Sequence, residues 1–275
     1  MLNDVLKTII AEQRQQNVPK QVIINSLREY IQYVILSEIY NSRDFKKMIF
    51  KGGSCMRIGY DLPRLSEDLD FDYLPKSLVK KPLTSLAEYL LGQIKNKQFN
   101  LIETKIQSDN RLYLKFPILY GLGLNQKPEI DKLYVKIEAE DEILPYAGII
   151  FKPVAKFGFN FLARTYDLPT LMAGKIHAFL NRIWFKGKKQ EINIKGRDFY
   201  DLWWFFDKKV TPNWKTLKKT TEVKDEKSLK RLLSERIKKV VTPGKLSFDL
   251  QNFISDQEFV FDFAKNYWKI INRYL

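Results

Sequence analysis

The chain has 275 residues, 45% hydrophobic and 14% aromatic, which is enough apolar material for a buried core and excludes an intrinsically disordered protein. A single cysteine, Cys55, excludes an intramolecular disulfide and a cysteine-rich zinc site, and a single histidine, His177, argues against a multi-histidine metal site or a Ser-His-Asp triad. The net charge of +15 favours polyanionic partners, although a solvated lysine-rich surface would give the same value.

Helical spacing of apolar residues predicts helices over 2–16 and 19–41, and the second is apolar nearly all round, so it should be buried. A short helix is predicted over 54–60 and another over 83–97. Pro153 favours a sheet edge for the last predicted strand. Strands are predicted over 46–50, 67–74, 101–107, 112–120, 133–140 and 149–157.

From about residue 168 the pattern becomes helical and lysine-rich. Helices are predicted over 167–185, 196–207, 213–219, 226–241 and 262–275, with the basic loop KGKKQEINIKG at 186–196. Strand-rich and helix-rich halves in sequence predict an α+β protein. We expect an N-terminal α/β domain over 1–165, with its N-terminal helices, and a C-terminal helical domain over 166–275.

No apolar run approaches the length of a membrane span, and the first residues, MLNDVLKTIIAEQRQQ, are too polar for a secretory signal. A single cysteine also fits a reducing compartment. We therefore expect a cytoplasmic protein with no membrane partner, whose chemistry depends on carboxylates, lysines and arginines.

The segment GGSCMRIGYDLPRLSEDLDFDYL, residues 52–74, combines two features of a nucleotide site. Gly52 and Gly53 allow close backbone approach to a phosphate, and Ser54 is expected to cap the following helix and offer a hydroxyl. Asp68 and Asp70 should project from one face of a strand, about 7 Å apart at their Cα atoms. Two carboxylates at that spacing can bind one Mg²⁺, or two ions in a phosphoryl-transfer site.

The alternative interpretation of this segment is an edge strand with a charged solvent face and an ordinary glycine turn. Asp-x-Asp alone is a weak signal. The order strand, Gly-Gly-Ser, helix, turn, strand agrees with the motif, and this agreement favours the nucleotide site.

Gly-Gly-Ser, thirteen intervening residues and Asp-Leu-Asp resemble the motif of the DNA polymerase β-like nucleotidyltransferases. More narrowly, KGGSCMRIGYDLPRLSEDLDF resembles the AbiEii-type nucleotidyltransferases, the toxins of type IV toxin–antitoxin systems. MAGKIHAFLNR and KGRDFYDLWWF resemble the lysine and Arg-Asp motifs of that family, although Gly174 stands where a glutamate is usual. The resemblance implies a polymerase β-like domain with a mixed sheet, followed by a C-terminal helical bundle.

A third acidic ligand is expected on a later strand. In LYVKIEAE, residues 133–140, one face is apolar and the other carries Lys136, Glu138 and Glu140. The resemblance places the third metal ligand at Glu138, with Glu140 as the alternative. A solvated face explains either glutamate taken singly.

Lys175 falls inside the apolar stripe of its predicted helix, between Leu171 and Phe179, so it must either extend to solvent or meet an anion. The resemblance assigns it to the nucleotide phosphates. Arg182 lies seven residues further on along the same side and joins the candidate nucleotide-binding residues. His177 points to the opposite face and is expected to be exposed and without a role.

Asp198 and Asp201 share an inward face of the next helix. Helix-start aspartates often serve only as caps, but the resemblance makes Asp198 part of the catalytic site and leaves Asp201 to anchor the helix. Trp203 and Trp204 are expected to pack in the core or at a domain interface rather than to stack on bases.

These residues together predict a nucleotidyltransferase that uses an NTP and Mg²⁺, with Mn²⁺ as an alternative ion. The predicted catalytic residues are Asp68, Asp70, Glu138, Lys175 and Asp198. The resemblance implies a toxin that attaches nucleotides to an RNA acceptor such as the tRNA 3′ end, with a cognate antitoxin. The alternatives are nucleotidylation of a protein, or a nucleic-acid-binding module without catalysis.

Overall fold

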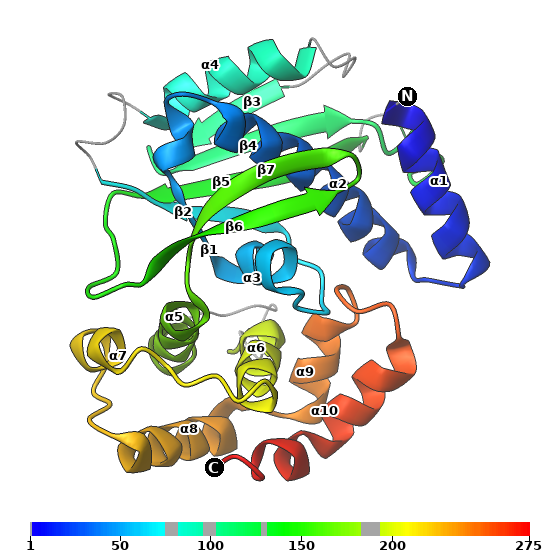
Figure 1. Cartoon of the computed structure of the whole chain (residues 1–275). Coiled ribbons are helices and arrows are strands. Elements are labelled where there is room, and N and C mark those ends of the chain that lie inside the picture. The colour runs from blue at the N-terminus through cyan, green and yellow to red at the C-terminus, as the bar shows by residue number, and fades with distance from the viewer. Residues whose placement is uncertain (1, 75–81, 96–102, 128–130, 183–192) are drawn as a thin grey trace. The chain divides into compact units, whose positions relative to one another are not determined.

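The computed structural model describes residues 2–74, 82–95, 103–127, 131–182 and 193–275 (Figure 1). They form one seven-stranded mixed sheet and ten α-helices, so the predicted α+β class and the C-terminal helices are confirmed. Two compact units make up the chain. Unit 1 comprises Met1–Ile143 and Ile149–Thr165, and unit 2 comprises Leu144–Gly148 and Tyr166–Leu275.

The sheet of unit 1 has the order β3-β4-β5-β2-β1-β7-β6. Strand β2 pairs with β5 in parallel and with β1 in antiparallel orientation, so it lies in the middle of the sheet. Strand β1 also pairs with β7 in parallel, and β4 pairs with β3 and β5 in antiparallel orientation. The strands are β1 (Ile49–Lys51), β2 (Asp68–Asp72), β3 (Glu103–Gln107), β4 (Arg111–Pro117), β5 (Lys132–Glu140), β6 (Ile149–Lys156) and β7 (Phe159–Tyr166).

Most predicted strands form, with two differences. Residues Phe45–Lys47 form a 3₁₀ helix, so the first strand begins at Ile49 rather than at residue 46. Strand β7 is not among the predicted strands, although its inward residues alternate as a half-buried strand requires. Phe157 and Gly158, both with positive φ, form the two-residue turn from β6 to β7. Strand β6, which contains Pro153, is at the sheet edge as predicted.

Four helices belong to unit 1: α1 (Leu2–Gln15), α2 (Lys20–Asn41), α3 (Gly52–Tyr60) and α4 (Pro82–Lys95). Helix α2 is buried along most of its length, as its apolar composition predicts, and contacts α1, α4 and β5. The apolar residues of β5, including Val135 and Ile137, are fully buried. The other face of β5, opposite these apolar side chains, is therefore the face available for a polar site.

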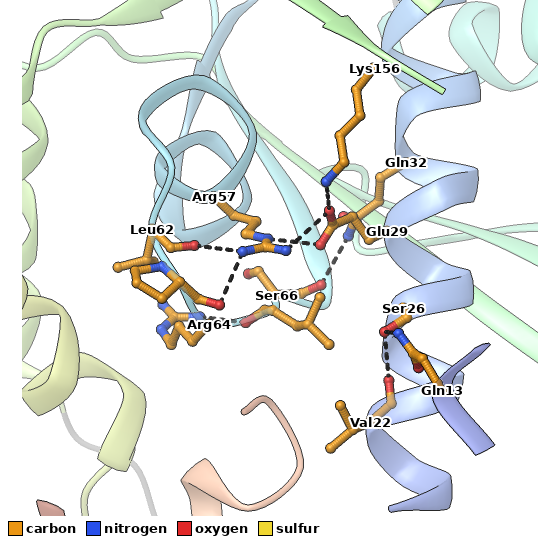
Figure 2. Close-up of polar contacts among 12 residues, drawn as sticks. Gln13, Val22, Ser26, Glu29, Gln32, Arg57, Leu62, Arg64, Ser66 and Lys156 are labelled. Atoms are coloured by element: carbon orange, nitrogen blue, oxygen red, sulfur yellow. Dashed lines mark hydrogen bonds and ion pairs between the residues drawn. The ribbon is translucent and has the colours of Figure 1, made fainter. Parts of the chain in front are cut away.

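A buried carboxylate joins three elements of unit 1 (Figure 2). Glu29 of α2 is only 3% exposed and accepts hydrogen bonds from Arg57 Nε of α3 at 2.9 Å and Lys156 Nζ of β6 at 3.0 Å. Two cations offset the cost of burying the charge of Glu29. Arg57 thereby fixes α3 against α2.

Arg57 and Gln32 hold the turn between α3 and β2 (Figure 2). Arg57 Nη1 donates to the carbonyl oxygens of Leu62 and Pro63, each at 3.0 Å. Gln32 Nε2 of α2 donates to the carbonyl oxygens of Ser66 and Glu67, at 3.2 and 3.0 Å. These bonds satisfy carbonyls that a sheet or helix would otherwise pair, and they fix the backbone directly before Asp68.

Unit 2 is helical, and side chains mark where several of its helices begin. Asp167, Asn213, Asp225, Thr242 and Asp256 accept hydrogen bonds from backbone amides at the starts of α5, α7, α8, α9 and α10. None of the helices in the described residues is long and apolar enough to cross a membrane. The helices are α5 (Leu168–Asn181), α6 (Gly196–Asp207), α7 (Trp214–Thr220), α8 (Glu226–Val240), α9 (Pro243–Leu250) and α10 (Gln257–Ile271).

Two features of unit 2 differ from the sequence prediction. Helix α9 is not among the predicted helices, and α10 begins at Gln257 rather than at residue 262. Both starts carry a helix-start signal, Thr242 followed by Pro243 and the capping Asp256. Of the two tryptophans of α6, Trp204 packs in the core as expected and is 3% exposed, whereas Trp203 is half-buried and lies edge-on against Phe263.

Candidate active site

Helix α3 begins directly at the end of β1, and its first turn contains the Gly-Gly-Ser sequence. Lys51 is the N-cap residue and makes no side-chain capping bond, so the expectation that Ser54 caps this helix is wrong. Ser54 is fully buried, and its hydroxyl donates to the carbonyl oxygen of Asp68. The Ser54 side chain therefore ties α3 to β2, and the backbone amides of the first turn are the groups that can receive an anion.

Gly52 and Gly53 are required by close contacts. Gly52 has φ of +77°, and a Cβ there would overlap the carboxylate of Asp70. A Cβ on Gly53 would lie 2.8 Å from Ser66 Oγ and 2.9 Å from Arg64 Nη2, at a fully buried arginine. The absence of a side chain at Gly52 lets the helix start lie directly against the Asp70 carboxylate, and its absence at Gly53 makes room for Ser66 and the buried Arg64.

Gly52→Ala should therefore destabilise the protein by about 1–2 kcal/mol through the left-handed backbone alone, with a further cost for displacing Asp70. Gly59→Ala is the matched control, because Gly59 lies in the same helix and a Cβ there meets nothing within 4 Å. We expect that control to be neutral or to gain about 0.5–1 kcal/mol. Chemical denaturation of both variants measures this difference, and equal stabilities would contradict the close contact.

The carboxylates of β2 face acidic and basic residues of β5. The parallel register pairs Asp68 with Lys136, Asp70 with Glu138 and Asp72 with Glu140. Residues paired in this way project from the same face of a sheet. The structure thus brings together Asp68, Asp70 and Glu138, which the sequence analysis singles out as the acidic set.

Lysines bridge the carboxylates in pairs. Lys136 Nζ lies 3.0 Å from Asp68 Oδ2 and 3.1 Å from Glu138 Oε1. Lys51 Nζ lies 2.6 Å from Asp72 Oδ1 and 2.5 Å from Glu140 Oε2. Glu140 thus lies beside Asp72, whereas Glu138 lies beside Asp70. This register favours Glu138 over Glu140 as the third acidic residue.

Neighbouring cations keep Glu138 ionised. Burial tends to raise the pKa of Glu138, but attraction to Lys136 and Arg111 and their hydrogen bonds outweigh it, so this pKa lies below its usual value. Arg111 Nε is 2.8 Å from Glu138 Oε1. Burial lowers the pKa of Lys136, but its interactions with Asp68 and Glu138 outweigh this effect, so the pKa lies above its usual value. Glu138 is therefore suited to holding positive charge and is a weak proton acceptor.

The donor set fits a hard divalent cation in its chemistry. Asp68 and Asp70 supply carboxylate oxygens on one face, and Mg²⁺ commonly takes few protein carboxylates and keeps several waters. Glu138 is engaged by two cations. Within the described residues, no group of three or more His, Cys, Asp or Glu side chains is arranged to hold a metal ion. Asp68 and Asp70 are therefore the residues that could hold such an ion, with Asp68 also paired to Lys136.

A second charged cluster lies in unit 2, between α5 and α6. Lys175 Nζ is 2.7 Å from Asp201 Oδ2 and 3.4 Å from Asp198 Oδ1. Lys175 points inward, and the carboxylates of Asp198 and Asp201 on α6 neutralise its charge. His177 is exposed, as expected. Asp201 is fully buried, which agrees with its predicted inward orientation.

Asp198 also binds Arg182, the residue that ends α5, with Nη1 at 2.5 Å from Oδ2. Its side chain is 6% exposed, whereas that of Arg182 is 39% exposed. Asp198 thus makes ion pairs with two cations rather than serving as a simple cap. Arg182 is the member of the cluster that reaches solvent and can meet an anionic ligand.

Several residues around the acidic set carry no role in the sequence analysis. Arg57 and Arg64 lie inside the quoted glycine-to-aspartate segment, and Lys136 and Arg111 lie on β5 and β4. Period-two alternation places Lys136 on the same face of β5 as Glu138, and this pattern could have predicted a role for Lys136. The pairing of Arg111 with Glu138 depends on the β4–β5 register, which the sequence pattern does not specify.

A glycine-led helix start beside a strand with two carboxylates is the arrangement of an enzyme that transfers nucleotides. The family model described as the nucleotidyl transferase AbiEii toxin of type IV toxin–antitoxin systems matches residues 34–273. The chain belongs to this nucleotidyltransferase toxin family, as its motifs predict.

Solved structures similar to this chain at low sequence identity include the following two. JHP933 from Helicobacter pylori is 20% identical with a TM-score of 0.45, over 90% of this chain and 94% of the other. MenT4, the nucleotidyltransferase toxin Rv2826c from Mycobacterium tuberculosis H37Rv, is 12% identical with a TM-score of 0.45, over 97% of each chain. A search of curated proteins found no match.

Proposed function

We propose that this protein transfers nucleotides from an NTP to an RNA acceptor, such as the 3′ end of a tRNA, in a reaction that depends on Mg²⁺ or Mn²⁺. The observation that carries the proposal is the contact between the start of α3 and Asp70, which places anion-binding amides beside a carboxylate pair. Membership of a toxin family supports action with a cognate antitoxin.

Each group of the site has a role in this proposal. The backbone amides of Gly52, Gly53 and Ser54 bind phosphate oxygens of the triphosphate. Asp68 and Asp70 hold the divalent ion, with Glu138 as the third carboxylate. When bound, the ion offsets the negative charge of the phosphates and favours the ionised form of the attacking hydroxyl.

The bond changes follow from this arrangement. The acceptor hydroxyl oxygen bonds to the α-phosphorus of the NTP, the bond from that phosphorus to the β-phosphate bridging oxygen breaks, and pyrophosphate leaves. The hydroxyl proton goes to solvent, because the lowered pKa of Glu138 makes it a poor acceptor. The family resemblance supports Lys175 and Arg182 as further cations for phosphates, and within unit 2 both pair with Asp198.

The test is incubation of the purified protein with Mn²⁺ or Mg²⁺, each labelled NTP in turn, and either total RNA or a protein extract. We expect label in RNA with one or a few of the nucleotides. Label in protein would show protein nucleotidylation instead. Loss of metal with EDTA should abolish labelling, and labelling that persists in EDTA would contradict the metal dependence.

The net charge of +15 fits an RNA acceptor and gives a second prediction. RNA affinity should fall steeply between low and physiological salt, because phosphate contacts release counterions. Charge reversal at Lys188, Lys189 and Lys195 should weaken binding for all RNA sequences alike. Lys195 is the N-cap residue of α6, and Lys188 and Lys189 lie outside the described residues.

Fluorescence anisotropy with labelled RNA at several salt concentrations measures both effects. Reversal at Lys7, Lys46 and Lys47 is the control, because it changes the net charge equally at exposed positions of unit 1. An equal loss in both triple variants would show that net charge alone sets affinity. An affinity that does not respond to salt would contradict the RNA acceptor.

A further inference from the structure

Lys136 occupies the position between two of the three proposed metal ligands. Its ammonium group lies 3.0 Å from Asp68 and 3.1 Å from Glu138, and its side chain is 23% exposed. The β2–β5 register places Lys136 directly across from Asp68, and Glu138 follows two residues later on the same strand face. The contact is therefore built into the backbone pairing of the two strands.

The charges of this face leave room for a divalent cation. On β1, β2, β4 and β5, the register rows that contain Asp68, Asp70 and Asp72 carry five carboxylates, Asp68, Asp70, Asp72, Glu138 and Glu140, against three cations, Lys51, Arg111 and Lys136. Lys51 bridges Asp72 and Glu140, which the proposed metal site does not use. Lys136 bridges Asp68 and Glu138, which it does use.

We propose that Lys136 is a built-in counter-cation that a divalent metal ion displaces, so that this lysine weakens metal affinity. This inference rests on the metal dependence proposed above. An ammonium and a divalent ion within a few ångströms repel each other strongly in a partly buried site, so both cannot bridge the same carboxylates. Metal binding therefore requires Lys136 Nζ to leave Asp68 and Glu138.

Lys136, rather than Arg111, is the group that leaves. Arg111 pairs with Glu138 and its side chain is 44% exposed, whereas Lys136 pairs with both Asp68 and Glu138. Lysine carries a compact charge on a flexible four-carbon stem, which can rotate away without moving the strand. Arg111 then remains to hold Glu138 in place.

The first test is Mn²⁺ binding to the nucleotide-free full chain, followed through the electron paramagnetic resonance signal of free Mn²⁺. Lys136→Met keeps the length of the side chain and removes its charge, and it should bind Mn²⁺ about tenfold more tightly or better. Lys132→Met is the matched control. Lys132 lies on the same strand but pairs with Glu103 at 2.9 Å, so its loss should leave Mn²⁺ affinity unchanged.

The second test uses the wild-type protein, so it does not depend on the folding of a variant. An amine-reactive reagent is applied with and without Mn²⁺, and modification of each lysine is followed by peptide mass spectrometry. Mn²⁺ should speed modification of Lys136, which the ion releases, and leave Lys51 and Lys132 unchanged.

The outcomes separate this inference from the proposed function. If wild-type protein binds Mn²⁺ but Lys136→Met binds no more tightly and Lys136 labelling does not change, the displacement is wrong and the metal dependence stands. If neither protein binds Mn²⁺, the proposed metal dependence fails and the displacement fails with it. If Lys136→Met does not fold, the labelling result decides alone.

Discussion

Replacing Asp68 and Asp70 together by asparagine is expected to lower nucleotide transfer by about three orders of magnitude or more while the protein remains folded. Both side chains lie on the face where the start of α3 meets β2. Asparagine preserves their shape but binds divalent cations poorly, so the ion would no longer be held beside the triphosphate. Metal-dependent nucleotide binding should be lost with transfer.

The folded state should tolerate this double change. Asp68 is 33% exposed, and Lys136 keeps Glu138 as a partner in the variant, so the melting temperature should move by only a few degrees. Asp44→Asn with Asp109→Asn is the matched control, since both are exposed carboxylates of unit 1. Turnover of labelled NTP and thermal melting are measured for both. Wild-type transfer in the Asp68 and Asp70 double variant would refute the metal assignment.

The second large effect separates stability from activity in unit 2. Asp201 is fully buried and makes the short ion pair with Lys175, whose side chain is 14% exposed. Asp201→Asn leaves Lys175 with only the longer contact to Asp198, and a broken buried pair costs about 3–5 kcal/mol. Asp198→Asn keeps the buried Lys175–Asp201 pair and loses the pair with Arg182, whose side chain is 39% exposed, so it should cost less stability.

Activity should respond in the opposite order. Asp198 holds Arg182, the exposed cation of the cluster, and loss of this positioning should lower turnover roughly a hundredfold. Asp201→Asn should lower turnover less, at a temperature where the variant is folded. Chemical denaturation and turnover are measured side by side, with Asp207→Asn as an exposed control in α6. Wild-type turnover in Asp198→Asn would reduce Asp198 to a structural role.

The local part of the acidic site follows from the sequence pattern. Period-two alternation places Asp68 and Asp70 on one face, and alternation on β5 places Glu138 opposite the apolar face. The meeting of these residues depends on parallel pairing of β2 with β5, which are separated by α4, β3 and β4 along the chain. Alternation specifies the face on which a side chain lies but not which strand is its neighbour. Only the family resemblance could therefore predict that Glu138 lies beside Asp68 and Asp70.

The long-range polar contacts could not be predicted in the same way. Glu29 lies on a helix that is apolar nearly all round, and its partners Arg57 and Lys156 come from α3 and β6. Ser54 has the composition of a cap, yet its hydroxyl reaches the backbone of β2. In each case the partner is chosen by tertiary packing, which local propensity does not describe.

In unit 2, helical spacing alone predicted more. Helical spacing places Lys175 of α5 on an inward face, and it places Asp198 and Asp201 of α6 on an inward face as well. An ion-pair cluster between these two faces could therefore be predicted from the sequence. The spacing did not specify that Arg182 would end α5 and turn to Asp198. Strand β7 is not among the predicted strands, although Phe161, Ala163 and Thr165 alternate as buried positions.

The central claim is that this chain adds nucleotides to the 3′ hydroxyl of an RNA. The most direct measurement incubates wild-type protein, Mn²⁺ and a labelled NTP with purified tRNA, half of it oxidised by periodate so that its terminal ribose has no 3′ hydroxyl. We expect intact tRNA to become labelled and longer, and oxidised tRNA to remain unlabelled. We expect no label on either tRNA with the Asp68 and Asp70 double variant. Equal labelling of intact and oxidised tRNA, or label only on protein, would contradict it.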